Sequence, residues 1–502
     1  MDNNPGVDKD SFLHSREGFT EVLGWLEGPD AAALSHAELE DSLDVRGREL
    51  LRRMFQDHLS LRAVTEKRLR GILDAQARTY GAAEAGHHRP LATVFGEVEV
   101  TRLAYRRRGQ TNLYPADATL NLPAERHSHG LRRLAATEAA RGSFQEAAAA
   151  LERATGQHLG KRQVEALTDR AAVDVEAFYA TRADAAAEGA EGDVLVLSAD
   201  GKGIVMRPDA LRPATAKAAT AATTKLACRL SKGEKRNRKR LAEVGAVYDL
   251  SPVPRTPADV LTSKTGDAPP PAPKAGAKWV TASVVEDAAT VIAKVFDEAE
   301  RRDPSHCRRW VALVDGNNHQ ISRIEAEAKT RGVDVAIVVD LIHVLEYLWG
   351  AVWCFFNEGD PAAQAWVHDR ALAVLNGSAR QVAAGIRRRA TTARLTKQKR
   401  IKADACAKYL TNKADYLDYP TALSKGWPIA SGVIEGACRY LVADRMDITG
   451  ARWSVNGAEA VLKLRAVRAN DDFEDYWKFH LNNERHRVHK TRYASGTIPI
   501  AA

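Results

Sequence analysis

Short apolar segments alternate with helical patterns in the C-terminal part of the sequence, and this alternation constrains the fold more than any other feature. From Glu191 onward, runs rich in Val, Ala and Leu have the composition of buried strands, and stretches of helical period separate the later ones. The predicted order is three strands, helix, strand, helix, strand, typical of an α/β protein. The expected strands are 193–200, 204–206, 242–250, 310–314 and 335–339, the expected helices are 284–302 and 321–330, and the Pro- and Ala-rich segment 251–277 is an expected loop.

Three of the expected strands end in or are followed by aspartate, at Asp200, Asp315 and Asp340. Aspartate commonly begins turns, so each residue alone has an ordinary structural explanation. Ligands of open α/β sheets, however, bind beyond the carboxyl ends of the strands, and three aspartates there favour a shared site. Carboxylate oxygens are the ligands that Mg²⁺ prefers, and Mg²⁺ can activate a nucleophile that attacks a phosphodiester. The five cysteines contain no CxxC pair, which argues against a thiolate zinc site and a disulfide framework.

A further carboxylate is expected from a helix that begins near Ser431 and packs against the sheet. Apolar residues repeat there at helical spacing, which predicts a buried face, and Ser431 is the expected N-cap. Glu435 stands beside this face and is the candidate third ligand. The alternative is a first-turn acid that is favoured by the helix dipole and paired with Arg439. The residues of the buried face are Ile434, Ala437, Cys438 and Leu441.

The N-terminal part has a different character. Residues 1 to about 90 predict helices, because apolar residues follow helical spacing and strand signals are few. The segment 93–108 alternates apolar and polar residues about Gly96 and predicts a strand or hairpin that ends in three arginines.

Residues 130–178 predict a helix-turn-helix. Ser143 and Glu146 have the spacing of a capping box, the helix that follows should stop at Thr155-Gly156, and a second helix should begin at Lys161. A helix that opens with Lys161, Arg162 and Gln163 offers guanidinium and amide groups for reading base edges. Many helical pairs share this outline, so structural packing remains the alternative.

The basic residues are concentrated in two short segments. The formal net charge is +8; the segment 229–240 contributes +6 and the segment 387–402 contributes +8, so the rest of the chain is mildly acidic. Such concentration is usual for a polyanion-binding surface, although a single run of this kind is more often a solvated face. The sequence therefore favours nucleic acid as a partner.

Several stretches together resemble a known family. The motifs "LSADGKGIVMRPDALRPAT", "WVALVDGNNHQ", "VVDLIHVLEYLW" and "SGVIEGACRYLVADRMDITGARWSVNGAEAVLKLRAV" are similar to the DDE transposases of bacterial insertion sequences of the ISKra type, which are related to Mutator-like transposases. The similarity covers roughly residues 193–467 and, more faintly, 93–170. It implies an RNase H-like core split by a helical insertion, and two Mg²⁺ or Mn²⁺ ions held by Asp200, Asp315 and Glu435.

The resemblance also assigns expected roles to other residues. Asp340 and His343 match an Asp/Cys-x-x-His element and are expected to support the site rather than to ligate metal. Arg452 and Trp453 lie in a G-x-R-W-S stretch, where DNA contact and core packing are both open. The expected DNA-contacting residues are Lys161, Arg162, Gln163, Lys235, Arg236, Arg238, Lys239, Arg240, Arg387, Arg388, Arg389 and Arg452.

The expected fold is therefore a multidomain α/β protein with a mainly helical N-terminal region, a small β element and a helix-turn-helix. The expected parts are 1–90 helical, 91–190 DNA-binding, 191–350 and 429–470 core, 351–428 helical insertion and 471–502 polar tail. The expected function is DNA transposition through strand cleavage and transfer, by a homo-oligomer bound to double-stranded transposon ends and target DNA. The rivals are a structure-selective nuclease and a catalytically silent DNA-binding protein. No membrane span is expected, and the acidic start predicts a cytoplasmic location at the bacterial nucleoid.

Overall fold

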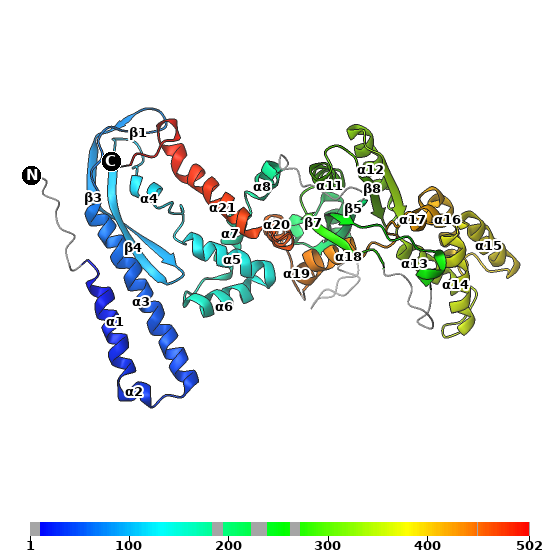
Figure 1. The fold of residues 1–502 in the computed structure, drawn as a ribbon, viewed down its shortest axis with the longest axis horizontal. Coiled ribbons are helices and arrows are strands. Elements are labelled where there is room, and N and C mark those ends of the chain that lie inside the picture. Colours follow the sequence, from blue (N-terminus) through cyan, green and yellow to red (C-terminus); the bar gives the residue numbers. More distant parts are fainter. Residues whose placement is uncertain (1–10, 183–193, 222–237, 262–271, 449, 501–502) are drawn as a thin grey trace, which may run out of the picture. The chain divides into compact units, whose positions relative to one another are not determined.

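The computed structural model describes residues 11–182, 194–221, 238–261, 272–448 and 450–500. The chain forms two compact units (Figure 1). Unit 1 comprises residues up to Phe178 together with Asp472 and the residues after it, and unit 2 comprises Tyr179–Asp471. None of the described helices is both long and apolar enough to cross a membrane.

Unit 1 begins with a helical hairpin, which packs on a β-hairpin. The helices are α1 (Leu13–Leu26), α2 (Pro29–Ala32) and α3 (His36–Thr65), and the strands are β1 (Ile72–Leu73), β2 (Thr79–Tyr80), β3 (Ala82–Thr93) and β4 (Gly96–Arg106). The expectation of helices up to residue 90 is wrong beyond Thr65. The sequence of β3 carries little strand signal of its own, and the strand is defined by its antiparallel pairing with β4. The turn between them contains Gly96, at φ 135°, so the expected hairpin at 93–108 is confirmed and begins earlier.

A short helix that was not predicted follows the hairpin, and the helices expected within residues 130–178 are confirmed after it. They are α4 (Pro115–Thr119), α5 (His129–Arg141), α6 (Phe144–Thr155), α7 (Lys161–Ala171) and α8 (Val175–Arg182). Ser143 and Glu146 form the capping box at the start of α6, and Gly156 ends the helix in the left-handed conformation. Leu131, Leu151 and Val164, one from each of α5, α6 and α7, are buried in one apolar cluster.

The C-terminal segment is not the expected polar tail. It forms α21 (Phe473–Glu484) and short turns up to Gly496, and it packs into unit 1 through a buried ionic network. The fully buried Arg132 guanidinium of α5 donates to Glu484 at 2.6 Å and to His480 Nε2 at 3.1 Å. His480 Nδ1 bonds Asp174 at 2.7 Å. Burial opposes ionisation of Asp174, but hydrogen bonds from His480 and Arg487 outweigh it, so the pKa of Asp174 lies below its ordinary value.

Unit 2 is built on a mixed five-stranded sheet of order β7-β6-β5-β8-β9. β5 is antiparallel to β6, and β6 to β7, whereas β8 is parallel to β5, and β9 to β8. The strands are β5 (Val194–Val205), β6 (Lys239–Leu250), β7 (Ala275–Ser283), β8 (Arg309–Val314) and β9 (Val335–Val339). The unit is therefore mixed α/β, as expected.

Two details of the expected strands are wrong. The segments 193–200 and 204–206 form a single strand, β5, because it pairs with β6 along its whole length. A Cβ at Gly201 or Gly203 would lie 2.8 Å from the side chain of Leu241 or Lys239, so glycine leaves room for these flexible side chains of β6. The third strand is β7, which begins inside the segment expected to be a loop.

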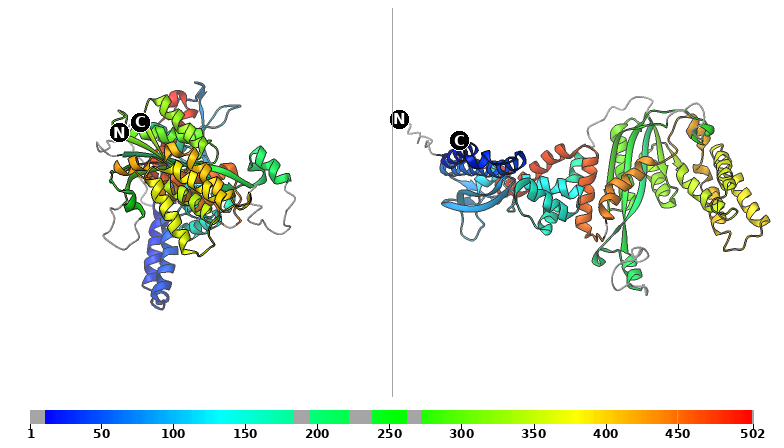
Figure 2. Two further views of the ribbon diagram at one scale, coloured as in Figure 1. Left: turned by 90° about the vertical axis from the view of Figure 1, so that its right-hand side faces the viewer. Right: turned by 90° about the horizontal axis from the view of Figure 1, so that it is seen from below.

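Helices cover the sheet and extend beyond it. They are α9 (Pro213–Ala221), α10 (Pro257–Leu261), α11 (Ala288–Arg302), α12 (Asn318–Arg331), α13 (Leu341–Val352), α14 (Pro361–Leu375), α15 (Ala379–Thr392), α16 (Ile401–Asn412), α17 (Tyr419–Ser424), α18 (Gly432–Ala437), α19 (Asp444–Met446) and α20 (Val455–Ala469). Helix α11 lies so close to the sheet that a Cβ at Gly245 of β6 would be 2.5 Å from Val295. The segment between β9 and α18 is helical, as expected, and Figures 1 and 2 show its yellow helices gathered to one side of the sheet.

Candidate functional site

The pairing of β5 with β8 aligns two of the candidate carboxylates. Leu197 pairs with Ala312, and every pair of this ladder has the same offset of 115 residues. The same 115 residues separate Asp200 from Asp315, so both follow the last pair of this ladder by three residues. The register therefore directs both aspartates toward the same end of the parallel half of the sheet.

The pairing of β8 with β9 extends this row to the third aspartate. Val314 pairs with Val339, an offset of 25 residues that also separates Asp315 from Asp340. The N–H of Asp340 donates to the carbonyl of Val314 at 2.8 Å, which fixes the row at the point where the two strands end. Asp315 and Asp340 therefore follow the carboxyl ends of β8 and β9, and Asp200 lies toward the same edge of the parallel half of the sheet. The expectation that Asp200 ends a strand is wrong, because β5 continues to Val205 and Asp200 pairs with Val244 of β6.

The buried carboxylate of Asp340 connects this edge to α18. Asp340 caps α13 by accepting from the N–H of Ile342 at 2.6 Å, and it accepts from the N–H of Ser431 at 2.9 Å and from the Ser431 hydroxyl. A fully buried carboxylate requires such donors. The hydroxyl of Ser431 is therefore a hydrogen-bond donor to Asp340. The expectation that the Ser431 side chain caps α18 is wrong. Asp340 supports the site in the sense that it positions the start of α18.

The helix that begins with α18 brings Cys438 into contact with Asp200. The face expected to be buried is confirmed, since Ile434, Ala437, Cys438 and Leu441 are all buried. The Sγ of Cys438 lies 3.4 Å from Oδ2 of Asp200, and Glu435 lies one turn before Cys438. Burial raises the pKa of the Cys438 thiol, and the charges of Asp200 and Glu435 raise it further. The two carboxylates thus share this neutral thiol as a neighbour.

The side chain of Glu435 is exposed, and its Oε1 lies 3.4 Å from the Ser431 hydroxyl, whose one proton is donated to Asp340. Arg439, which was a possible ion-pair partner of Glu435, instead pairs with Asp444 at 3.6 Å. The helix continues after Glu435 as a π-helical segment, Cys438–Ala443. Such segments occur frequently at functional sites.

The insertion contributes residues to the surroundings of Asp315. The hydroxyl of Tyr409 on α16 donates to the backbone carbonyl of Asp315 at 2.9 Å, and its ring stacks on Tyr347 of α13 at a centroid distance of 4.0 Å. Gly316 is at φ +89°, and a Cβ there would lie 2.8 Å from the Tyr409 hydroxyl. Burial lowers the pKa of nearby Lys413, whereas the charge of Asp315 opposes this shift. Sequence analysis missed Tyr409 and Lys413, and it placed Cys438 on a buried face without predicting its contact with Asp200, because only tertiary contacts bring these residues here.

The donor set of this edge has the chemistry that divalent cations require, because carboxylate oxygens are hard ligands. Asp200 accepts from the N–H of Gly201 at 2.6 Å, and Asp315 accepts from the N–H of Asn317 at 2.7 Å. Within the described ranges, no three His, Cys, Asp or Glu side chains are grouped closely enough to hold a metal ion. The strand pairing and α18 therefore bring Asp200, Asp315 and Glu435 to one edge of the sheet. Their side chains are not close enough together to form a metal site in this structure.

The other residues expected near the site have mixed outcomes. His343 is half-buried and its Nδ1 lies 3.3 Å from Glu346. Trp453 is buried, pairs with Met206 in a parallel bridge and carries the guanidinium of Arg445 over its ring at 4.6 Å. Its role is core packing. Arg452, its neighbour, is exposed.

At the start of α7, Lys161 and Arg162 are exposed, as a DNA-reading helix would require. Gln163 is also exposed, but its Oε1 accepts from the N–H of Gly160 at 2.8 Å. Gln163 therefore caps the helix in this structure, and its carbonyl oxygen is already engaged.

The two basic segments differ in how much of them is described. Lys235 and Arg236 lie outside the described residues; Arg238 and Lys239 are half-buried, and Arg240 donates to the carbonyl of Val284 at 2.8 Å. In the second segment, Arg387 and Arg388 of α15 are exposed.

Arg389 differs from its two neighbours. Its guanidinium lies 4.6 Å from the ring centroid of Phe356 and 4.9 Å from that of Phe355. Burial also lowers its pKa. Arg389 thus has a packing role that Arg387 and Arg388 do not share.

Comparison with protein-family models gives no match for this chain, and no curated protein matches its sequence. The functional assignment therefore depends on the residues and geometry described above.

Proposed function

We propose that the protein is a DNA transposase whose unit 2 is an RNase H-like catalytic core. The single observation that carries this proposal is the row of Asp200, Asp315 and Asp340 at one edge of the sheet, faced by the helix that bears Glu435. Three antiparallel strands followed by helix, strand, helix, strand is the element order expected of such a core. The helical segment between β9 and α18 occupies the place of the expected insertion.

Asp200, Asp315 and Glu435 would hold two Mg²⁺ or Mn²⁺ ions in this proposal. When bound, such ions neutralise the charge that develops on a phosphodiester and lower the pKa of a nucleophilic hydroxyl or water. The protein's own contribution is to position the ligands: Asp340 anchors the start of α18 through Ser431, and Tyr409 holds the Asp315 turn. The basic segments and α7 would bind DNA.

A cleavage assay tests the proposed activity. The full chain would be incubated with a plasmid that carries the sequences flanking its own reading frame, and the ends of the cut strands would be mapped. We expect metal-dependent cuts at short inverted repeats and joining of the released 3′ ends to other DNA. Cuts that ignore the repeats would instead indicate a structure-selective nuclease. DNA binding without metal-dependent cuts would indicate a silent DNA-binding protein.

The exposed arginines of α15 are predicted to bind the DNA backbone. Changing both Arg387 and Arg388 to Ala should flatten the log-log dependence of affinity on salt by roughly 2, because each phosphate contact contributes a slope of about −0.9. The sequence preference should stay nearly intact. The measurement is binding to duplex DNA over a salt series.

Arg389, on the same helix, is the control for the Arg387 and Arg388 substitutions. Because its guanidinium packs on Phe355 and Phe356, Arg389→Ala should lower the stability of the insertion more than it changes the salt dependence. A salt slope unaffected by the loss of Arg387 and Arg388 would mean that these residues form a solvated surface only.

The start of α7 is predicted to read bases through Arg162. Arg162→Ala should reduce the preference for the terminal repeat over scrambled DNA by roughly 1–3 kcal/mol, as expected for loss of a bidentate base contact. Gln163→Ala should mainly weaken the start of the helix, by about 1 kcal/mol, because Gln163 caps Gly160. Competitive binding and thermal unfolding of both variants separate the two roles. Equal losses of specific and non-specific affinity in Arg162→Ala would assign it to phosphate contact.

A further inference from the structure

The helical hairpin of unit 1 exposes an unusual amount of apolar surface. Of the large apolar residues that are exposed within the described chain, nine lie between Leu13 and Val64, including Phe19 at 54% and Leu51 at 45% exposure. Contiguous apolar patches of this kind mark interaction surfaces.

The contacts between α1 and α3 fix which faces of the two helices remain free. Ser15 of α1 donates through its N–H and hydroxyl to the buried carboxylate of Asp57 on α3, at 2.9 and 2.7 Å. A Cβ at Gly18 would touch Leu50 and Arg53 of α3. The contact line of α1 with α3 therefore contains Ser15, Gly18 and the residues that follow them at helical spacing. The two helices are antiparallel, because the earlier residue of α1 contacts the later residue of α3.

The exposed apolar residues fall on a second face of each helix. On α1 they are Phe19, Leu23 and Leu26, and on α3 they are Leu43, Leu51 and Met54. At 100° per residue, each set lies about a quarter turn from the contact line between the helices. Because the helices are antiparallel, the two sets come to the same side of the hairpin. We call these six residues the hairpin face.

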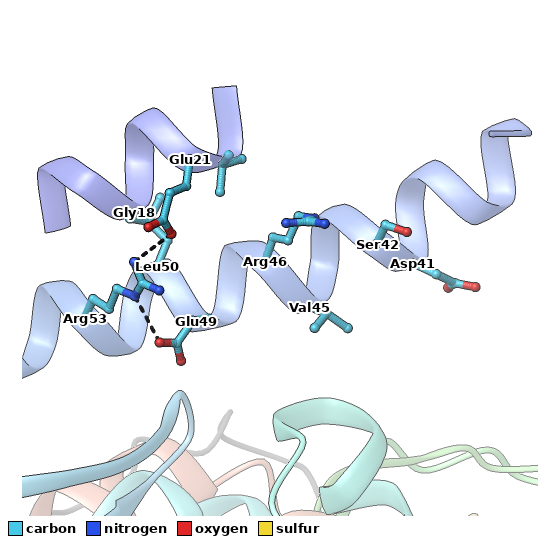
Figure 3. A pocket seen from close by; sticks show the side chains of 10 residues that line it. Gly18, Glu21, Asp41, Ser42, Val45, Arg46, Glu49, Leu50 and Arg53 are labelled. Atoms are coloured by element: carbon cyan, nitrogen blue, oxygen red, sulfur yellow. Dashed lines mark hydrogen bonds and ion pairs between the residues drawn. The ribbon is translucent and has the colours of Figure 1, made fainter. Parts of the chain in front are cut away.

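A groove of about 580 Å³ lies along the seam between the two helices, and none of the six residues of the hairpin face lines it, so it opens on the opposite side of the seam. Figure 3 shows that Arg53 reaches both Glu21 of α1 and Glu49 of α3. Arg46 lies over the ring of Trp25 at 4.2 Å. These pairs join the two helices along the contact line and leave the hairpin face uncovered.

The charge along α3 indicates which partner fits. Residues 36–45 carry a net charge of −4, and residues 46–62 carry +3. In the acidic half, Glu40 and Asp44 lie on α3 next to Leu43 of the hairpin face. When two such helices pair antiparallel, the acidic half of each lies against the basic half of the other. A two-fold axis produces this arrangement, because it brings the same surface of both copies together.

We propose that the hairpin face is a homodimer interface, in which the α1–α3 hairpins of two copies of this chain associate antiparallel into a four-helix bundle. Leu23, Leu51 and their neighbours are buried against their equivalents, and Glu40 and Asp44 face the basic half of the partner's α3. A two-helix hairpin cannot bury this face alone, whereas a four-helix bundle can. The surface assembles two copies whether or not unit 2 cleaves DNA.

Sedimentation equilibrium of the full chain without DNA tests this proposal. The wild type should show twice the chain mass of 54.8 kDa at micromolar concentration. Leu51→Glu and Leu23→Glu should each raise the dimer dissociation constant by more than about tenfold, because each introduces a charge into the apolar centre of the interface. Circular dichroism would verify that the helix content is kept.

Val64→Glu is the matched control, because Val64 is 86% exposed on the same helix but lies outside the hairpin face. Its dissociation constant should equal that of the wild type. A monomeric wild type would overturn the proposal and assign the face to a different protein. A Leu51→Glu protein that dimerises as tightly as Val64→Glu would also overturn it, because the dimer would then use another surface.

Discussion

Asp200→Asn is expected to lower the rate of metal-dependent DNA cleavage by at least about a thousandfold. The amide keeps the shape of the carboxylate and can still accept from the N–H of Gly201, so the strand should be unaffected. It removes the charge needed to hold a divalent ion, and loss of metal-based stabilisation of the transition state by about 4 kcal/mol corresponds to this factor. Asp315→Asn and Glu435→Gln should have effects of the same order. The measurement is the initial rate of plasmid nicking in Mg²⁺ and in Mn²⁺.

Asp334→Asn is the matched control for these variants. Asp334 lies immediately before β9, at the opposite end of the strand from Asp340, where its exposed carboxylate pairs with Arg309. It undergoes the same chemical change on the same sheet, and its cleavage rate should stay within about twofold of the wild type, as for an exposed ion pair. Cleavage by Asp200→Asn at the rate of Asp334→Asn would remove Asp200 from the catalytic site.

Arg132→Met is expected to destabilise unit 1 by about 3 kcal/mol, because it removes a fully buried guanidinium that pairs with both the buried Glu484 and the half-buried Glu125, although these carboxylates keep Arg487 and Arg170 as partners. The side chain of Arg132 is fully buried and is hydrogen-bonded to α21. Amide hydrogen exchange in α5 and α21 should accelerate by more than about a hundredfold. Hydrogen–deuterium exchange with peptide resolution measures this directly in the full chain.

Arg133→Met is the control in the adjacent position. Arg133 also pairs with α21, through Glu474, but both side chains are largely exposed, so its loss should cost about 0–1 kcal/mol. If the two variants exchanged alike, the C-terminal segment would not be an integral part of unit 1.

Local sequence patterns correctly predicted the helices and strands whose ends and buried faces are determined by residues within one short segment. Strand β9 is a continuous apolar run that ends at Asp340, and it has the predicted bounds. The capping box of Ser143 and Glu146 and the left-handed Gly156 likewise fixed both ends of α6. The buried face of the helix that carries Glu435 followed from spacing alone.

Elements defined by distant partners could not be predicted in this way. Strand β7 follows a Pro-rich segment and contains Gly and Lys, and its pairing with β6 makes it a strand. The bond from Ser431 to Asp340 spans 91 residues, and the bond from Tyr409 to Asp315 spans 94. Ser431 could cap its own helix by sequence, but the buried Asp340 competes successfully for its hydroxyl because a buried carboxylate needs donors more than a helix end does.

The most direct test of the proposed site is anomalous scattering from Mn²⁺ in crystals of the full chain bound to DNA. Two peaks about 3.5–4 Å apart, ligated by Asp200, Asp315 and Glu435, are the predicted result. Ions bound elsewhere, or bound at this edge without a contact to Glu435, would contradict the account.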